Sequence, residues 1–435
     1  MNRSVIINPF KMSELPAGPL SKLAETLIGS EIVRLGADIK EKMTKGDKIY
    51  NFTIGDFDSA IFPIPEELKD DIIEAYNEKF TTYPPAEGIL TLRDAVSRFV
   101  KMRQGLDYSS GEIIIAAGGR PLIYALYRAI VDKGDKVIYA VPSWNNNHYV
   151  HFTEGEHRVI ETTVANNFMP TASDIAPHIK GAALLALCAP LNPTGTTFQK
   201  KELEEICDLI IAENNSRSEH EKKLYVLFDQ IYWTLTFGSI EHYNPVSLRP
   251  EMKKYTIFID GISKAFAATG VRVGWSMGPR NVLDKMKAIN SHVGAWSPMA
   301  EQHATAKYLL KDEMIDNYFK HFKHELDERL TRIFEGFKKL KGEGFSVDAI
   351  TPQAAIYLTI QIDLVGKTTP SGTILKSQDM VTEFILNAAG LAIVPFYVFG
   401  ASHNSNWYRL SVGTCKKEEI DEMLARLKEV LSTLK

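Results

Sequence analysis

The feature that most constrains the fold is an alternation of short apolar runs with longer amphipathic runs through the middle of the chain. The short runs have strand length and are apolar throughout, as is expected of strands covered on both faces of a sheet. The longer runs repeat apolar residues every three or four positions, the spacing of a helix with one buried face. This order predicts an α/β fold with a largely parallel sheet. The expected strands lie within residues 112–119, 136–141, 181–190, 222–229 and 255–260, and 200–215 is an expected helix.

The last part of the chain has a different pattern. A long, charged amphipathic run at residues 312–342 precedes shorter apolar runs, and a final helix is expected from about Lys416. Residues 365–378 are polar and contain Gly and Pro, so we expect a loop there. This arrangement predicts a second, smaller α+β domain. The expected strands of this domain lie within residues 354–363, 392–396 and 407–413.

Composition excludes several classes of protein. The 435 residues are too many for one ordinary domain and suit two. The net charge of −4 does not favour a nucleic acid or an anionic membrane surface as a partner. The three cysteines have no metal-binding or disulfide spacing. The N-terminal residues lack the apolar core of a signal peptide, and no apolar run reaches the length of a membrane helix. We therefore expect a cytoplasmic protein without a metal site.

Polar residues follow each expected strand, and together they suggest one ligand. In open α/β sheets, ligands bind outside the carboxyl ends of the strands. Glycines before a helix can hold a phosphate, and a lysine can bond to an aldehyde. An aspartate can face a ring nitrogen, and an aromatic side chain can stack on a flat ring. These features suit pyridoxal phosphate. The residues concerned are Gly118, Gly119, Arg120, Trp144, Asn192, Asp229, Tyr232, Ser263, Lys264 and Arg272.

Seven short motifs follow one another along the chain: "NFTIGD" (51–56), "YPPAEGILTLRDA" (83–95), "AAGGRP" (116–121), "LNPTG" (191–195), "FDQIY" (228–232), "SKAFAATGVRVGW" (263–275) and "YRLSVG" (408–413). With these motifs the sequence resembles the class I aminotransferases, which are fold type I pyridoxal-phosphate enzymes, and within them most the bacterial-type aspartate and prephenate aminotransferases. The resemblance implies a seven-stranded, mostly parallel sheet in a large domain at 61–305, a small domain at 306–435, and a segment at 1–60 that joins the small domain. It also implies a homodimer.

The resemblance implies a role for each residue around the cofactor ring. Lys264 would bond to the cofactor's aldehyde and move the substrate's α-proton. Asp229 would pair with the ring nitrogen, and Tyr232 and Asn192 would contact the ring oxygen. Trp144 would stack on the ring. Taken alone, each residue also has a structural explanation, as a loop lysine, a helix cap, a turn residue or a core aromatic.

The resemblance assigns a second set of residues to the phosphate. Arg272 and Ser263 would bind it, and Gly119 and Arg120 would offer backbone N–H groups. Tyr83 would reach the phosphate bound by the neighbouring subunit of the homodimer. A solvated arginine, a capping serine and a turn tyrosine are the structural alternatives.

Two further residues would bind the amino acid substrate. Arg409 would clamp its α-carboxylate in a two-point contact, and Gly55 would leave room beside that carboxylate. Trp144 and Asn192 are also expected to touch the substrate. Arg120 stands where the resembling subgroup has a lysine that reaches a distal carboxylate, so we hypothesise an aspartate or glutamate donor. The alternative is that Arg120 faces solvent or pairs with a nearby acid.

The sequence departs from the family pattern at several points. Pro121 and Gln230 replace a usual glutamine and glutamate, and residues 352–358 and 394–396 differ near the substrate wall. The loop at 365–378 is longer. These changes bear on the substrate and leave the cofactor residues intact.

Other functions are compatible with the same cofactor residues. A β-lyase or an aminocyclopropane-carboxylate synthase would differ only in the substrate wall. A ligand-sensing regulator would carry an N-terminal DNA-binding domain. About 50 residues precede "NFTIGD", with no basic helix-turn-helix pattern, so a regulator is not favoured.

Overall fold

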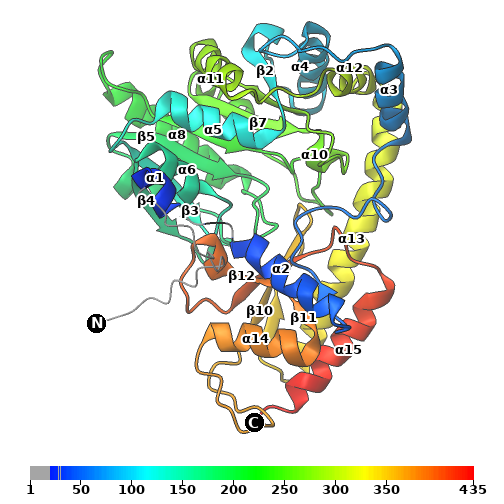
Figure 1. Ribbon diagram of the computed structural model, residues 1–435. Helices are drawn as coiled ribbons and strands as arrows, with labels where there is room; N and C mark the ends of the chain where they lie inside the picture. The colour runs from blue at the N-terminus through cyan, green and yellow to red at the C-terminus, as the bar shows by residue number, and fades with distance from the viewer. Residues whose placement is uncertain (1–19, 28, 30) are drawn as a thin grey trace.

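The computed structural model describes residues 20–27, 29 and 31–435 (Figure 1). The remainder of the predicted N-terminal segment, residues 1–19, 28 and 30, lies outside the described residues. A seven-stranded sheet with helices on its faces fills the upper part of Figure 1, and a smaller antiparallel sheet with its own helices lies below it. The predicted α/β fold with a smaller α+β unit is therefore confirmed.

The large sheet has the strand order β2-β8-β7-β6-β5-β3-β4. Strand β8 runs in the direction opposite to that of the other six strands, so the sheet is mostly parallel, as predicted. Each of the five apolar runs interpreted as a strand forms one. Two strands were not predicted: β8 is short, and β4 at the sheet edge is largely polar and exposed. The bounds are β2 (Ile113–Ala116), β3 (Lys136–Val141), β4 (Glu156–Glu161), β5 (Ala182–Cys188), β6 (Tyr225–Asp229), β7 (Thr256–Gly261) and β8 (Gly274–Met277).

The central strands are apolar on both sides because each sheet face is covered by helices. On β6, Val226 and Phe228 pack into one core and Leu227 packs into the other. The first core is completed by helices that include α4 and α8, and the second by α5 and α11. The helices around this sheet are α3 (Glu66–Asn77), α4 (Leu90–Gln104), α5 (Gly119–Ile130), α6 (Asn146–Thr153), α7 (Ala172–Ile175), α8 (Lys200–Ser216), α9 (Pro245–Leu248), α10 (Ile262–Ala265), α11 (Arg280–Val293) and α12 (Met299–Tyr308).

The smaller unit is built on an antiparallel sheet of order β12-β13-β10-β9. The three C-terminal apolar runs form its strands β10, β12 and β13, and residues 365–377 form the predicted loop apart from one isolated bridge. The elements are β9 (Val347–Ala349), β10 (Tyr357–Ile362), β12 (Val394–Pro395), β13 (Trp407–Ser411), α14 (Gln378–Ala389) and α15 (Glu418–Ser432).

The described N-terminal residues pack on this smaller unit. Strand β1 (Tyr50–Asn51) pairs in parallel with β11 (Leu391–Ala392), and Tyr50 and Phe52 lie in the core of the small unit. Helices α1 (Lys22–Thr26) and α2 (Glu31–Thr44) precede β1. The domain boundaries at 60/61 and 305/306 stay a prediction, although this packing is what they imply.

One long helix connects the two cores. Helix α13 (Asp312–Gly342) is the predicted charged amphipathic run, and it extends along the right side of Figure 1. Ile315, in its first turn, belongs to the core of the large sheet, whereas Phe322 and Leu326 belong to the core of the small unit. No helix among the described residues is long and apolar enough to cross a membrane.

Candidate active site

A cavity of about 570 Å³ lies where the two units meet. Parallel strands carry their carboxyl ends to one edge of a sheet, and the residues after β5, β6 and β7 reach this cavity from that edge. Tyr357 of β10 and Arg409 of β13 close it from the small unit. Of the candidate residues, all except Gly118 and Tyr83 line it. They are Gly55, Gly119, Arg120, Trp144, Asn192, Asp229, Tyr232, Ser263, Lys264, Arg272 and Arg409.

Lys264 is a half-buried lysine whose ammonium has an unusually low pKa. It lies in α10, directly after β7, and its Nζ donates a hydrogen bond to the Gly55 carbonyl at 2.6 Å. The pKa of Lys264 is lowered to about 8, chiefly by burial and also by the charges of Arg409 and Arg120, against a raising effect of Asp56. A lysine that loses its proton near neutral pH can act as a nucleophile and as a base.

Asp229 is a half-buried carboxyl at the end of β6. Burial raises its pKa to about 6, while the backbone N–H of Ile231, which donates to Oδ1 at 3.1 Å, lowers it. Asp229 forms no ion pair with the described residues. The carboxyl is therefore free to pair with a positively charged ring N–H placed in the cavity.

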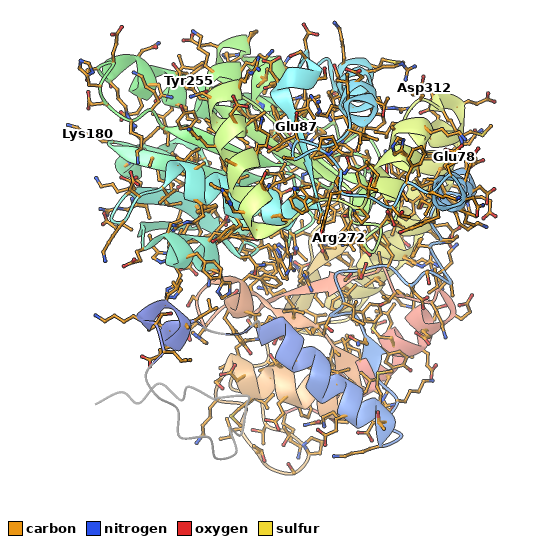
Figure 2. The ribbon with its side chains drawn as sticks, turned by 45° about the horizontal axis from the view of Figure 1, so that its top comes forward. Glu78, Glu87, Lys180, Tyr255, Arg272 and Asp312 are labelled. Carbon is orange, nitrogen blue, oxygen red and sulfur yellow. The ribbon has the colours of Figure 1, made fainter. Side chains whose placement is uncertain are left out.

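The start of α5 and Arg272 form a corner with the chemistry to hold an anion. The first N–H groups of a helix lack intrahelical partners and carry a partial positive charge. Gly118 caps this helix with φ +86°, and a Cβ there would lie 2.3 Å from Nη2 of Arg272, so only glycine fits. Arg272, which is labelled in Figure 2, is itself held by hydrogen bonds to the carbonyls of Thr269 and Ala117, at 2.6 and 2.7 Å. Ser263 lines the same cavity.

Arg409 is buried in the wall contributed by the small unit. Its Nη1 donates to Asn192 Oδ1 at 3.1 Å and its Nη2 to the Thr53 carbonyl at 2.6 Å, while its Nε has no partner. Burial lowers its pKa. A Cβ on Gly55 would lie 2.9 Å from Tyr357 Oη and 3.5 Å from Arg409 Nη1. Glycine at position 55 therefore keeps open the space beside the guanidinium.

Arg120 and Trp144 lie together at the exposed side of the cavity. The Arg120 guanidinium lies 5.4 Å from the centre of the Trp144 ring, and its side chain is exposed. It forms no ion pair with any acid of the described chain, which removes one of the two structural alternatives for this residue.

Tyr83 does not reach the cavity of its own chain. Its side chain is 83% exposed, and its ring contacts that of Trp296 edge-on at 5.2 Å between centroids. Its expected role in a neighbouring subunit stays a prediction.

The cavity also contains residues that the sequence analysis did not select. Tyr357 Oη lies 2.6 Å from Tyr232 Oη, and Asp56 accepts a hydrogen bond from Thr269 at 2.6 Å. Both had a signal in the sequence: Asp56 ends the motif "NFTIGD", and Tyr357 lies in the divergent segment 352–358. Cys188 and Ile123 line the wall without a comparable signal.

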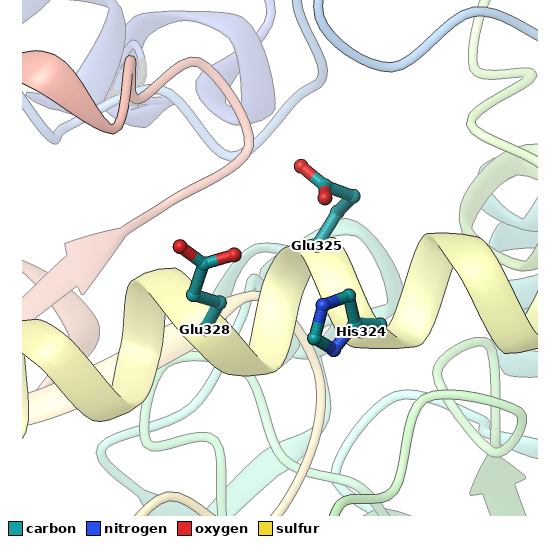
Figure 3. A group of neighbouring side chains, drawn as sticks. All are labelled: His324, Glu325 and Glu328. Carbon is teal, nitrogen blue, oxygen red and sulfur yellow. The ribbon is translucent and has the colours of Figure 1, made fainter.

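One group of side chains has the spacing of metal ligands. His324, Glu325 and Glu328 lie on one side of α13 (Figure 3). Lys417 forms ion pairs with both glutamates, and Arg329 pairs with Glu325 at 3.0 Å. Because these carboxylates already have cationic partners, the group does not indicate a metal site.

The residues of the cavity fit pyridoxal phosphate. The corner of α5 and Arg272 suits its phosphate, the unpaired Asp229 suits a protonated ring nitrogen, and Lys264 suits its aldehyde. Gly118 lies so close to Arg272 that a side chain at position 118 would collide with the guanidinium. The corner is therefore formed by the backbone at this position.

Comparisons with known proteins point in the same direction. A family model described as aminotransferase class I and II matches residues 47–427. A probable aspartate/prephenate aminotransferase of Rickettsia conorii is 27% identical, over 86% of this chain and 89% of that protein. An aspartate aminotransferase of Geobacillus stearothermophilus is 28% identical, over 91% and 94%. The solved aspartate aminotransferase of Thermus thermophilus with maleate is 26% identical and superposes with a TM-score of 0.84, over 95% of this chain and all of that one.

Proposed function

We propose that this chain, which belongs to the class I and II aminotransferases and transfers amino groups, takes the amino group from an acidic amino acid. Its cofactor is pyridoxal phosphate, on which this family generally depends. The acceptor is a 2-oxo acid, and the two half-reactions follow a ping-pong scheme. Relatives named aspartate aminotransferase and aspartate/prephenate aminotransferase support this choice of donor over a β-lyase or synthase reaction.

The observation that carries the proposal is a pair of arginines in one cavity. Arg409 is buried in the wall of the small unit, and Arg120 lies at the exposed side without an acidic partner in the described chain. A planar guanidinium binds a carboxylate through two parallel hydrogen bonds. An amino acid with two carboxylates can use both arginines, whereas one with an apolar side chain can use only Arg409.

The other residues of the cavity have roles in holding and orienting the cofactor and in placing protons. Bound pyridoxal phosphate supplies an aldehyde that bonds to amines and a protonated ring that accepts electrons. Arg272, Ser263 and the N–H groups of Gly119 and Arg120 hold the phosphate. Asp229 keeps the proton on the ring nitrogen, and Tyr232 and Asn192 orient the ring.

Lys264 carries the proton in the chemical step. Its Nζ takes the proton from Cα of the bound amino acid, which a base with a pKa near 8 can do close to neutral pH. Gly55, whose carbonyl accepts the Nζ hydrogen bond, holds the amine at the floor of the cavity.

Arg120 provides the test of the donor. In Arg120→Gln, kcat/KM for L-aspartate and L-glutamate is expected to fall about 10- to 100-fold, the value of a charge-assisted hydrogen bond. For L-alanine we expect a change of less than about three-fold, because this donor has no second carboxylate. Arg128→Gln is the matched control, since Arg128 lies on the same helix but donates to the Phe152 carbonyl at 3.1 Å. Equal losses with all three donors would contradict the proposal for Arg120.

We further propose a cytoplasmic homodimer. The three cysteines are free, which suits a reducing compartment. Tyr83 is the residue that would join the two sites, because it is exposed and does not line the cavity of its own chain. The proposal assigns its hydroxyl to the phosphate bound by the partner subunit.

Tyr83→Phe tests this contact. Loss of one hydrogen bond to a phosphate is expected to weaken pyridoxal phosphate binding about 10-fold, measured by titration of the cofactor-free protein. Tyr76→Phe is the control, because Tyr76 is also exposed but donates to Glu301 at 2.9 Å. Light scattering should give twice the chain mass. A monomer that binds the cofactor with unchanged affinity in Tyr83→Phe would exclude this arrangement.

A further inference from the structure

Asp260 is a second buried carboxyl beside the active site, and it does not line the cavity. It is the penultimate residue of β7 and is 0% exposed. Its Oδ1 accepts a hydrogen bond from the backbone N–H of Gly261 at 2.7 Å. Its Oδ2 accepts from Trp233 Nε1 at 2.8 Å and from Gln230 Nε2 at 3.4 Å. Both oxygens are therefore used as acceptors, and burial raises the pKa of Asp260 to about 8.

Gln230 is the second member of this network and is also 0% exposed. Its amide lies between Asp260 and His242, whose Nε2 is 3.3 Å from Gln230 Oε1. Its backbone N–H donates to the Ile259 carbonyl at 3.0 Å, and its own carbonyl accepts from the Trp233 N–H at 2.9 Å. Side chain and backbone together tie the turn that follows β6 to the end of β7.

The network joins the two segments that carry the proposed reactive groups. The turn after β6 begins at Asp229 and places Tyr232 in the cavity, between Gln230 and Trp233. Strand β7 continues from Asp260 through Gly261 into α10, which carries Ser263 and Lys264. A shift at Asp260 would therefore change the distance between the group that faces the ring nitrogen and the lysine.

We propose that Asp260, acting through Gln230 and Trp233, is a positioning residue that fixes Asp229 and Tyr232 relative to Lys264. Its effect on catalysis rests on the proposed function, but the network itself does not. The network also accounts for glutamine at position 230, where the resembling family has glutamate. A glutamate would place one carboxyl against another in a buried site, and like charges there are strongly disfavoured.

Asp260 and Gln230 can be tested by exchanging their side-chain types, a carboxyl and an amide. Asn at position 260 supplies one acceptor oxygen and one NH₂ group, so either Trp233 or Gly261 loses its acceptor. Glu at position 230 removes the amide donor. In the double variant Gln230→Glu with Asp260→Asn, a carboxyl and an amide face each other again, with their places exchanged.

The four proteins of this cycle are compared by three measurements. These are the unfolding midpoint of the cofactor-free protein, the affinity for pyridoxal phosphate with the visible absorption maximum of the bound form, and kcat and KM. Each single variant is expected to bind the cofactor about 10-fold more weakly, with a shifted absorption maximum. We expect kcat to fall about 10-fold, and KM for the amino donor to change less than about three-fold. If the two substitutions acted independently, the fold-losses of the single variants in cofactor affinity would multiply in the double variant. We expect the loss in the double variant to be smaller than this product by at least about five-fold, because the effects of neighbouring residues are not additive.

Additive losses in the cycle would overturn the network. A lowered unfolding midpoint with wild-type cofactor affinity, spectrum and kcat would overturn the positioning role and leave only a structural one. Asp363→Asn, an exposed aspartate on the small unit, is the control. If Asp260→Asn does not fold, Trp233→Phe removes one donor and keeps an aromatic ring. In Trp233→Phe, a two- to three-fold weaker affinity for pyridoxal phosphate supports the proposal, and an unchanged affinity contradicts it.

The same experiment separates the two proposals. If the wild-type protein binds no pyridoxal phosphate, the proposed function fails, yet coupling between positions 230 and 260 in the unfolding midpoint still reports whether the network exists.

Discussion

Replacing Lys264 with alanine is expected to lower kcat for amino transfer about 10⁴-fold or more. The variant loses the amine that bonds to the cofactor and the base that moves the α-proton, and base catalysis alone contributes up to about 10⁴-fold. No other lysine lines the cavity among the described residues. Lys285→Ala, on the exposed face of α11, is the control and should keep wild-type kcat. Residual activity within 10-fold of wild type would mean that another group carries the proton.

The same variant has a second signature in the cofactor-free protein. Burial lowers the pKa of Lys264 from 10.5 to about 8, so between these pH values the unfolded chain binds one proton that the folded chain has lost. Stability therefore rises with pH across this window in the wild type. Relative to Lys264→Ala, the wild type should gain about 3 kcal/mol of unfolding free energy between pH 8 and 10.5. Parallel stability profiles for the two proteins would show that the ammonium is not desolvated.

Replacing Asp229 with asparagine is expected to have the second-largest effect, a loss of about 10²- to 10³-fold in kcat. A preorganised charge that stabilises the reacting group typically contributes this amount. Asparagine keeps the size of the side chain but cannot pair ionically with a ring N–H, so the protein should fold and still bind the cofactor. Asp70→Asn, an exposed residue of α3, is the control. Wild-type kcat in Asp229→Asn would remove Asp229 from the mechanism.

The pH dependence of cofactor binding tests Asp229 independently. Burial raises its pKa from 3.8 to about 6 in the cofactor-free protein. Below pH 6 the carboxyl is protonated and cannot pair with a positively charged ring, so affinity for pyridoxal phosphate should fall as pH decreases from 6 to 5. The ratio of wild-type to Asp229→Asn affinity isolates this carboxyl and should decrease over the same interval. A constant ratio would argue against the pairing.

Local patterns were sufficient to predict the central sheet. Strands β3, β5, β6 and β7 are covered on both faces, so their sequences are continuously apolar and could be recognised without neighbours. Strand β4 could not be recognised from its sequence, because it lies at the edge of the sheet and five of its six residues are not buried. The two-residue strands β1 and β11 depend on each other across more than 300 residues of chain, which no local pattern reveals.

The residues of the candidate site also differ in whether a local sequence pattern could identify them. Residues such as Asp229 and Lys264 stand directly after strands, so their position in the sheet brings them together, and motif resemblance selected them. Tyr357 was missed because it lies in the segment 352–358, which departs from the family pattern, so the resemblance assigned no role to it. Asp260 also follows a strand-length apolar run, but its role could not be predicted because it depends on Trp233, a partner 27 positions away. Interactions of this kind appear only when the chain is folded.

The most direct test of the account is the visible absorption spectrum of the protein with pyridoxal phosphate, recorded before and after a single amino acid is added without an acceptor. We expect a yellow protein whose colour is discharged by L-aspartate or L-glutamate, with one equivalent of 2-oxo acid released per site. Addition of a different 2-oxo acid should then restore the colour. A protein that stays colourless with added cofactor would contradict the assignment of Lys264. A protein that releases ammonia with the oxo acid would be a lyase.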